Sequence, residues 1–128
     1  MPRVLVIDDQ SEVRTAIELA LRSLGFEVIA AESGASGLRK FRESHCDLAI
    51  VDVFMPGMDG VKLVRALRER APHLPVIVIS GVLLGESERT ALDFLPLAPG
   101  LPGIVCLQKP FRPVELIRAI EHAVGAPA

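Results

Sequence analysis

The chain has 128 residues, half of them hydrophobic, and a formal net charge of -2 at pH 7. This length suits one domain with a single core, and the hydrophobic content is too high for a disordered segment. The charge lacks the basic excess of nucleic-acid-binding proteins, and no apolar run approaches the ~20 residues that cross a bilayer. We therefore expect one cytoplasmic domain over residues 1–128, without an output domain and without direct contact with nucleic acid or membrane.

The first elements predicted along the chain are a strand and a helix. The apolar run at 4–7 has the β-branched composition of a buried strand and precedes Asp8 and Asp9. Ser11 is expected to cap a helix that ends before Gly25. Its core-facing residues, at the helical period, are predicted to be Val13, Ala16, Ile17, Ala20, Leu21 and Leu24.

The middle of the chain predicts two more pairs of strand and helix. A strand at 26–30 leads to a helix from about Gly34 to Ser44, and a strand at 47–52 ends at Asp52. The next helix is closed by Pro72, and a fourth strand at 75–80 ends at Ser80. The buried faces of these two helices are predicted to carry Ala35, Leu38 and Phe41, and Val61, Val64, Leu67 and Ala71, respectively.

The last third is less regular. A short helix from about Glu86 to Leu95 and an irregular proline-rich loop at 96–103 are expected after the fourth strand. The fifth strand, at 104–108, reaches Lys109, and Pro113 suits the first turn of a final helix. The inward side of that helix is predicted to carry Leu116, Ile117, Ile120 and Val124.

Five strands alternating with five helices predict an α/β fold, a doubly wound, flavodoxin-like parallel sheet in the order 2-1-3-4-5 with five flanking helices. The carboxyl ends of parallel strands lie along one edge, where such folds place their ligand crevice. Asp8, Asp9, Asp52, Ser80 and Lys109 all follow or end strands, so we expect them to meet there.

These side chains predict a site for a divalent cation and a phosphoryl group. Three carboxylates repel one another, so their assembly implies a cation, and oxygen-only ligands in an exposed site favour Mg²⁺. Lys109 offers a compact positive charge and Ser80 a hydroxyl donor to phosphoryl oxygens. The available nucleophile is a carboxylate, so the expected product is an aspartyl phosphate.

On these residues the chain resembles a response-regulator receiver domain, the phosphoacceptor module of two-component signalling. The matching motifs are Asp8-Asp9, the stretch 52–60, Ser80-Gly81 and Lys109-Pro110-Phe111. The resemblance implies that Asp52 accepts the phosphoryl group, and that the Lys109-Pro110 peptide bond is cis. It also implies a Mg²⁺ site formed by Asp8 (through a water), Asp9, Asp52 and the backbone carbonyl of Phe54, with Lys109 and Ser80 on the phosphoryl group.

The resemblance also implies the partners. The phosphoryl donor would be a sensor histidine kinase, a phosphotransfer protein or a small phosphodonor such as acetyl phosphate. The receiver itself catalyses transfer and later hydrolysis, so the chain is expected to be a switch, acting on an unknown effector protein, and not an enzyme with separate substrates. A monomer or weak homodimer is expected.

Two features depart from the family pattern. Cys106 stands where receivers commonly carry Tyr or Phe, and the segment between Ser80 and Lys109 is longer than usual, with apolar residues at 82–84 as a candidate partner surface. These departures leave open a receiver-like module that binds proteins without phosphorylation. The same residues are also compatible with an aspartate-nucleophile phosphatase and with a purely structural ion-pair cluster.

Overall fold

The structure, a computed structural model, contains a five-stranded parallel sheet in the predicted order β2-β1-β3-β4-β5. It describes residues 2–53, 60–80 and 104–125. The strands are β1 (Arg3–Ile7), β2 (Glu27–Ala31), β3 (Leu48–Asp52), β4 (Val76–Ser80) and β5 (Ile104–Gln108). The helices are α1 (Ser11–Ser23), α2 (Gly34–Glu43), α3 (Gly60–Arg70) and α5 (Pro113–Gly125). The helix predicted at 86–95, the proline-rich loop and the apolar run at 82–84 lie outside the described residues.

The register of the strands aligns their carboxyl ends. Asp52 at the end of β3 pairs with Ile79 in β4, and Ser80 pairs with Gln108 in β5. β1 ends one residue before Asp8 and is hydrogen-bonded to both β2 and β3. The direction of the strand order therefore reverses between β1 and β3, and the residues after these strands share one edge of the sheet.

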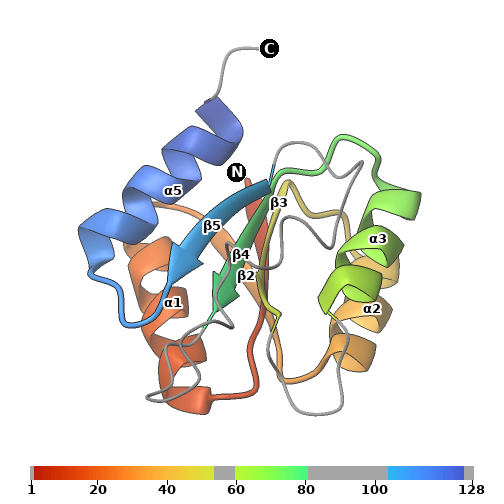
Figure 1. The fold of residues 1–128 in the computed structure, drawn as a ribbon, viewed down its shortest axis with the longest axis horizontal. Helices are drawn as coiled ribbons and strands as arrows, with labels where there is room; N and C mark the ends of the chain where they lie inside the picture. Colours follow the sequence, from red (N-terminus) through yellow and green to blue (C-terminus); the bar gives the residue numbers. More distant parts are fainter. Residues whose placement is uncertain (1, 54–59, 81–103, 126–128) are drawn as a thin grey trace.

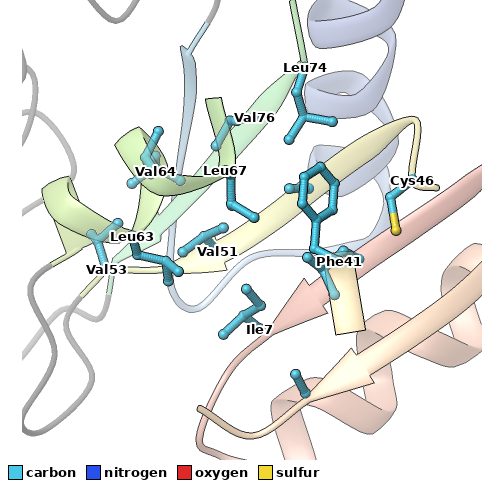
Figure 2. Close-up of a cluster of buried hydrophobic side chains, with 14 residues drawn as sticks. Ile7, Phe41, Cys46, Val51, Val53, Leu63, Val64, Leu67, Leu74 and Val76 are labelled. Atoms are coloured by element: carbon cyan, nitrogen blue, oxygen red, sulfur yellow. The ribbon is translucent and has the colours of Figure 1, made fainter. Parts of the chain in front are cut away.

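Helices cover both faces of the sheet, with α1 and α5 on one side and α2 and α3 on the other (Figure 1). Each face of the sheet forms a hydrophobic core with its helices, and Figure 2 shows the core under α2 and α3. In this core Phe41 from α2 and Leu63 and Leu67 from α3 pack with Ile7 and Val51 of the sheet. The described side chains of the inner strands β1, β3 and β4 are almost entirely buried, which explains why these strands are continuous apolar runs in the sequence. The edge strands β2 and β5 are only partly buried. Among the described helices, none combines the length and apolarity needed to cross a membrane.

The end of α1 is as predicted, but its beginning is not. Gly25 adopts a left-handed φ of 91°, and the N–H groups of Gly25 and Phe26 donate to the carbonyls of Arg22 and Leu21. This pair of bonds is a Schellman motif, which stops the helix. Ser11, predicted to be the N-cap, is instead the first helical residue, and Gln10 occupies the N-cap position.

Four residues predicted to face the core are exposed: Ala16, Leu24, Ala35 and Val124. Leu24 comes after the last residue of α1, and Val124 belongs to the last turn of α5, which extends past the start of β5 (Figure 1). At the helical period, Ala16 and Ala35 lie at the borders of their apolar stripes, and both are exposed. The remaining predicted core residues of these helices are buried or partly buried, although the side chain of Val61 lies outside the described part.

Gly37 explains why the buried face of α2 differs from the predicted one. A Cβ atom at Gly37 would lie 2.7 Å from Cγ1 of Ile7 in β1, well inside van der Waals contact. The helix backbone therefore packs directly on the sheet at a glycine, and Gly34 and Gly37 are buried where Ala35 was predicted. The helix starts at a Ser33 cap, whose hydroxyl oxygen accepts a hydrogen bond from the Ser36 N–H.

Candidate functional site

Asp8 is the most enclosed polar residue of the site. It follows β1, its side chain is fully buried, and its backbone N–H donates to the carbonyl of Ala31 at the end of β2. Oδ1 accepts a hydrogen bond of 2.8 Å from the backbone N–H of Gln10, and the Arg14 guanidinium donates to the Asp8 carbonyl at 2.7 Å. The carboxylate is thus held in one orientation by the turn between β1 and α1.

Asp52 ends the central strand β3 and is only 4% exposed. The next residue, Val53, donates its N–H to the carbonyl of Ile79 in β4, so the pairing of the two strands continues past the carboxylate. The first residue of α3, Gly60, packs against Val53 so closely that a Cβ atom there would lie 2.8 Å from the Val53 Cα. A glycine at this position lets α3 begin next to the end of the strand that carries Asp52.

Lys109 connects the two buried carboxylates. Its side chain is 13% exposed, and Nζ lies 3.0 Å from Asp8 Oδ2 and 3.1 Å from Asp52 Oδ2. Nζ also donates a hydrogen bond of 2.7 Å to the side-chain oxygen of Gln10. The Lys109-Pro110 peptide bond is cis, as the resemblance implied. The predicted lysine therefore lies among the predicted aspartates.

Asp9 completes an acidic group with Asp8 and Asp52. One carboxylate oxygen from each of these three residues lies within 4.8 Å of the other two. Three carboxylates against the single ammonium of Lys109 leave two negative charges in excess within this group. Of the three, Asp9 is exposed, which opens the group to solvent on one side.

The donor set fits a Mg²⁺ ion. Opposite ligands of an octahedral Mg²⁺ ion are about 4.2 Å apart, which is twice the ~2.1 Å Mg–O distance. The three carboxylate oxygens lie within 4.8 Å of one another, so they could bind one ion after small side-chain movements or through one bridging water. Asp8 Oδ2 is buried and has no hydrogen bond among the described residues, with the ion pair to Lys109 as its contact. A buried carboxylate oxygen in that state is a ready ligand.

Two predicted site residues are described in part or not at all. Ser80 ends β4 at the same edge of the sheet, but its side chain lies outside the described part. Phe54, whose carbonyl was expected to bind the metal, also lies outside the described residues.

Sequence reasoning missed Gln10, which contacts both Asp8 and Lys109. A signal existed, because Gln10 directly follows the two aspartates and immediately precedes the predicted helix. The predicted cap at Ser11 concealed it, since a serine is the more usual N-cap residue.

Cys106 lies in the middle of β5 and is half-buried. It packs against the cluster under α2 and α3, and burial raises the pKa of its thiol. Burial likewise raises the pKa of Cys46. Neither cysteine is in a disulfide, and both thiols stay protonated at neutral pH, so neither has the thiolate character of a reactive cysteine.

Comparison with known proteins agrees with this geometry. The sequence model of the response regulator receiver domain family matches residues 4–121 of the chain. The transcriptional regulatory protein PrrA of Mycobacterium tuberculosis is 47% identical over 79 residues, which cover 62% of this chain and 34% of PrrA. The match therefore spans about a third of the length of that relative.

Two solved structures share the fold over nearly the whole chain. The chemotaxis protein CheY4 of Vibrio cholerae superposes with a TM-score of 0.84 at 26% identity, covering 97% of this chain and 99% of that chain. The response regulator protein TrrA of Thermotoga maritima, in complex with Mg²⁺-BeF, gives a TM-score of 0.77 at 27% identity, covering 97% and 100%. With the family match, the strand order and the cluster of aspartates and lysine at the strand ends, the chain belongs to the response regulator receiver domain family of two-component systems.

Proposed function

We propose that the chain is a phosphoacceptor switch in which Asp52 takes up a phosphoryl group. The observation that carries this proposal is the pairing of Asp52 with Lys109, which Asp8 shares, at the edge of the sheet. Asp52 is the member of the acidic group that ends the central strand, beside the lysine that would face the incoming phosphoryl group. Asp8 is less suited to be the acceptor, because its carboxylate is fully buried and tied to the turn before α1.

The proposed reaction transfers the phosphoryl group from a phosphohistidine to a carboxylate. An oxygen of Asp52 attacks phosphorus and an O–P bond forms. The P–N bond of the donor breaks, and its electron pair stays on the imidazole nitrogen, which then takes up a proton. With acetyl phosphate the broken bond is P–O and acetate leaves. The protein's contribution is positioning and charge stabilisation, because phosphoryl transfer needs little else.

Asp8, Asp9 and Asp52 would hold Mg²⁺, with the Phe54 carbonyl as a further ligand. Bound there, the ion neutralises the excess carboxylate charge and stabilises the developing charge on phosphoryl oxygens. The TrrA structure supports this, since it is a Mg²⁺-BeF complex of a protein with the same fold. The donor set supports it independently, because each of the three carboxylates offers an oxygen within 4.8 Å of the other two.

Lys109 and Ser80 would contact the phosphoryl group. The Lys109 ammonium faces Asp52, and a phosphoryl group on Asp52 would extend toward it. An ammonium shared by two carboxylates before transfer then pairs with phosphoryl oxygen after transfer. Ser80 ends the neighbouring strand, which supports a role for its hydroxyl as a second donor.

The partners belong to the same proposal. Receiver domains pair with histidine kinases, so a sensor kinase or a phosphotransfer protein is the proposed donor. PrrA is a transcriptional regulatory protein about three times longer than the matched stretch. The proposed effector is therefore either another domain of the same polypeptide or a separate protein. We place this signalling in the cytoplasm, where sensor kinases present their phosphohistidine.

The decisive experiment combines a phosphodonor with intact-mass measurement. The protein is incubated with acetyl phosphate and Mg²⁺, and a mass gain of one phosphoryl group is expected. Asp52→Asn should abolish the gain, because an amide is not a competent nucleophile. Asp47→Asn is the matched control, since Asp47 is exposed and lies at the opposite end of β3 from Asp52, and it should be phosphorylated like the wild type. An undiminished gain in Asp52→Asn would reject the assignment.

A second candidate is a receiver-like module that binds proteins without phosphorylation. Its support is Cys106, which occupies the β5 position where receivers commonly carry an aromatic ring. No mass gain in the wild-type protein, together with unchanged partner binding in Asp52→Asn, would favour this second function.

A further inference from the structure

Gln10 is placed to act on the phosphorylation site, although the fold does not need its side chain. Its backbone is fixed on both sides, because its N–H donates to Asp8 Oδ1 and its carbonyl accepts from the Arg14 N–H at 2.9 Å. At the N-cap of α1 its side chain makes no capping hydrogen bond. The amide oxygen instead accepts a hydrogen bond from Lys109, 99 positions along the chain.

Gln10 supplies one of three oxygen neighbours of the Lys109 ammonium. The other two are carboxylate oxygens of Asp8 at 3.0 Å and Asp52 at 3.1 Å, whereas the Gln10 oxygen is the nearest at 2.7 Å. An ammonium has three N–H donors, and that of Lys109 donates hydrogen bonds to Gln10 and Asp52, whereas its contact with Asp8 Oδ2 is an ion pair. The Gln10 oxygen differs from the other two in carrying no formal charge.

The difference in charge matters during phosphoryl uptake. Asp8 and Asp52 are both proposed ligands of Mg²⁺, and Asp52 is also the proposed phosphoryl acceptor. The ion pairs of these two carboxylates with Lys109 are therefore expected to weaken as the reaction proceeds. The neutral amide of Gln10 is not a ligand in this scheme and keeps its hydrogen bond. It does so without neutralising the positive charge that the phosphoryl group needs.

We infer that Gln10 is a positioning residue that holds the Lys109 ammonium toward Asp52 during phosphoryl transfer. This inference rests on the proposed function of Asp52. Gln10 acts through Lys109 and not on the phosphoryl group directly. Because Gln10 is exposed, water competes for the hydrogen bond, and the expected loss on its removal is about three- to tenfold in the rate of phosphorylation.

The first test observes the Lys109 ammonium without a phosphodonor or Mg²⁺. The chain has only three lysines, Lys40, Lys62 and Lys109, so ammonium ¹⁵N–¹H resonances are readily assigned. A hydrogen-bonded, shielded ammonium exchanges slowly and should give a resonance for Lys109 in the wild type. Gln10→Met, which keeps the length but removes the amide, should broaden or shift this resonance. Lys40, whose ammonium donates to the Ala30 carbonyl, is an internal reference that should not change.

The matched control is Gln108→Met. Gln108 is an exposed glutamine next to Lys109 in the chain, at the end of β5, so the same amide is removed without removing the Gln10 hydrogen bond. Its spectrum and phosphorylation rate should match those of the wild type. A missing Lys109 resonance in the wild type, an unchanged one in Gln10→Met, or an equal change in Gln108→Met would overturn the inference.

The second test is a double-mutant cycle with Lys109→Ala. Gln10→Met should slow uptake from acetyl phosphate about three- to tenfold in the wild-type background and should have no further effect when Lys109 is absent. Equal slowing in both backgrounds would show that Gln10 does not act through Lys109. If no variant is phosphorylated at all but the resonance still depends on Gln10, the proposed function fails while the placement of Lys109 by Gln10 stands.

Discussion

Individual residues of the site combine burial with excess negative charge. Asp8 and Asp52 are almost inaccessible to water, and both depend on the ammonium of Lys109 for compensation. A buried charge that loses its partner is destabilising, because the desolvation penalty is no longer offset. The same lysine thus has a structural role in the free protein and the proposed role in phosphoryl transfer.

Replacing Lys109 by methionine tests this structural role. We expect Lys109→Met to lower the free energy of unfolding by about 3 kcal/mol in the absence of divalent cations, because two buried carboxylates would lose their counter-charge. Urea denaturation in the presence of EDTA measures the change. Arg65→Met, which also removes a positive charge but at an exposed position of α3, should stay within about 0.5 kcal/mol of the wild type. Equal stability of Lys109→Met and the wild type would contradict a compensating ion pair.

Between secondary-structure elements, close contact of helices with the sheet decides the packing. α2 approaches β1 through Gly37, and α3 begins against Val53 through Gly60. The spacing of apolar residues in the sequence predicted both helices. It did not predict where they approach the sheet most closely, because the residues at those positions are glycines, which have no side chain. Glycine permits these contacts because it has no Cβ atom, so its importance depends on how close the neighbouring element lies.

Gly37→Ala distinguishes packing from helix propensity. Propensity alone favours alanine by about 1 kcal/mol, whereas the added Cβ would collide with Ile7. We expect the collision to dominate and the free energy of unfolding to fall by about 1–2 kcal/mol. Combining the change with Ile7→Val, which removes the Cδ1 atom, should reduce this loss relative to the Ile7→Val parent. A gain in stability from Gly37→Ala alone would show that the sheet adapts to the methyl group.

Across the molecule as a whole, the topology gathers charge at one edge of the sheet. Residues from positions 8 to 109 meet there only because parallel strands end on the same side and the order reverses between β1 and β3. An excess of carboxylates at that edge costs stability in the free protein. Folding and cation binding should therefore be linked.

This linkage predicts stabilisation of the folded protein by Mg²⁺. At 100 times the dissociation constant, a ligand that binds only the folded state adds about 2.7 kcal/mol to the free energy of unfolding. Thermal denaturation at increasing Mg²⁺ should show a rising midpoint. Asp9→Asn, which removes the exposed carboxylate of the group, should weaken the response markedly. A midpoint that does not depend on Mg²⁺ in the wild type would argue against the metal site.

The amino-acid sequence alone sufficed to predict the sheet order, the strand boundaries to within about a residue, and the meeting of Asp8, Asp9, Asp52 and Lys109 at the strand ends. These features follow from local patterns, since β-branched runs, glycine and proline at element ends, and helical periods act over a few residues. The acidic edge with Asp8, Asp9, Asp52 and Lys109 follows from them, because parallel strands place their carboxyl ends together.

Contacts between side chains, in contrast, were set by the three-dimensional packing. The hydrogen bond from Lys109 to Gln10, the direct packing of Gly37 on Ile7, and the exposure of Ala16 depend on how far apart elements lie. Such distances result from the joint packing of segments that are remote in sequence. A local pattern contains no information on them, so it predicts that a helix faces the sheet but not where the covered surface ends.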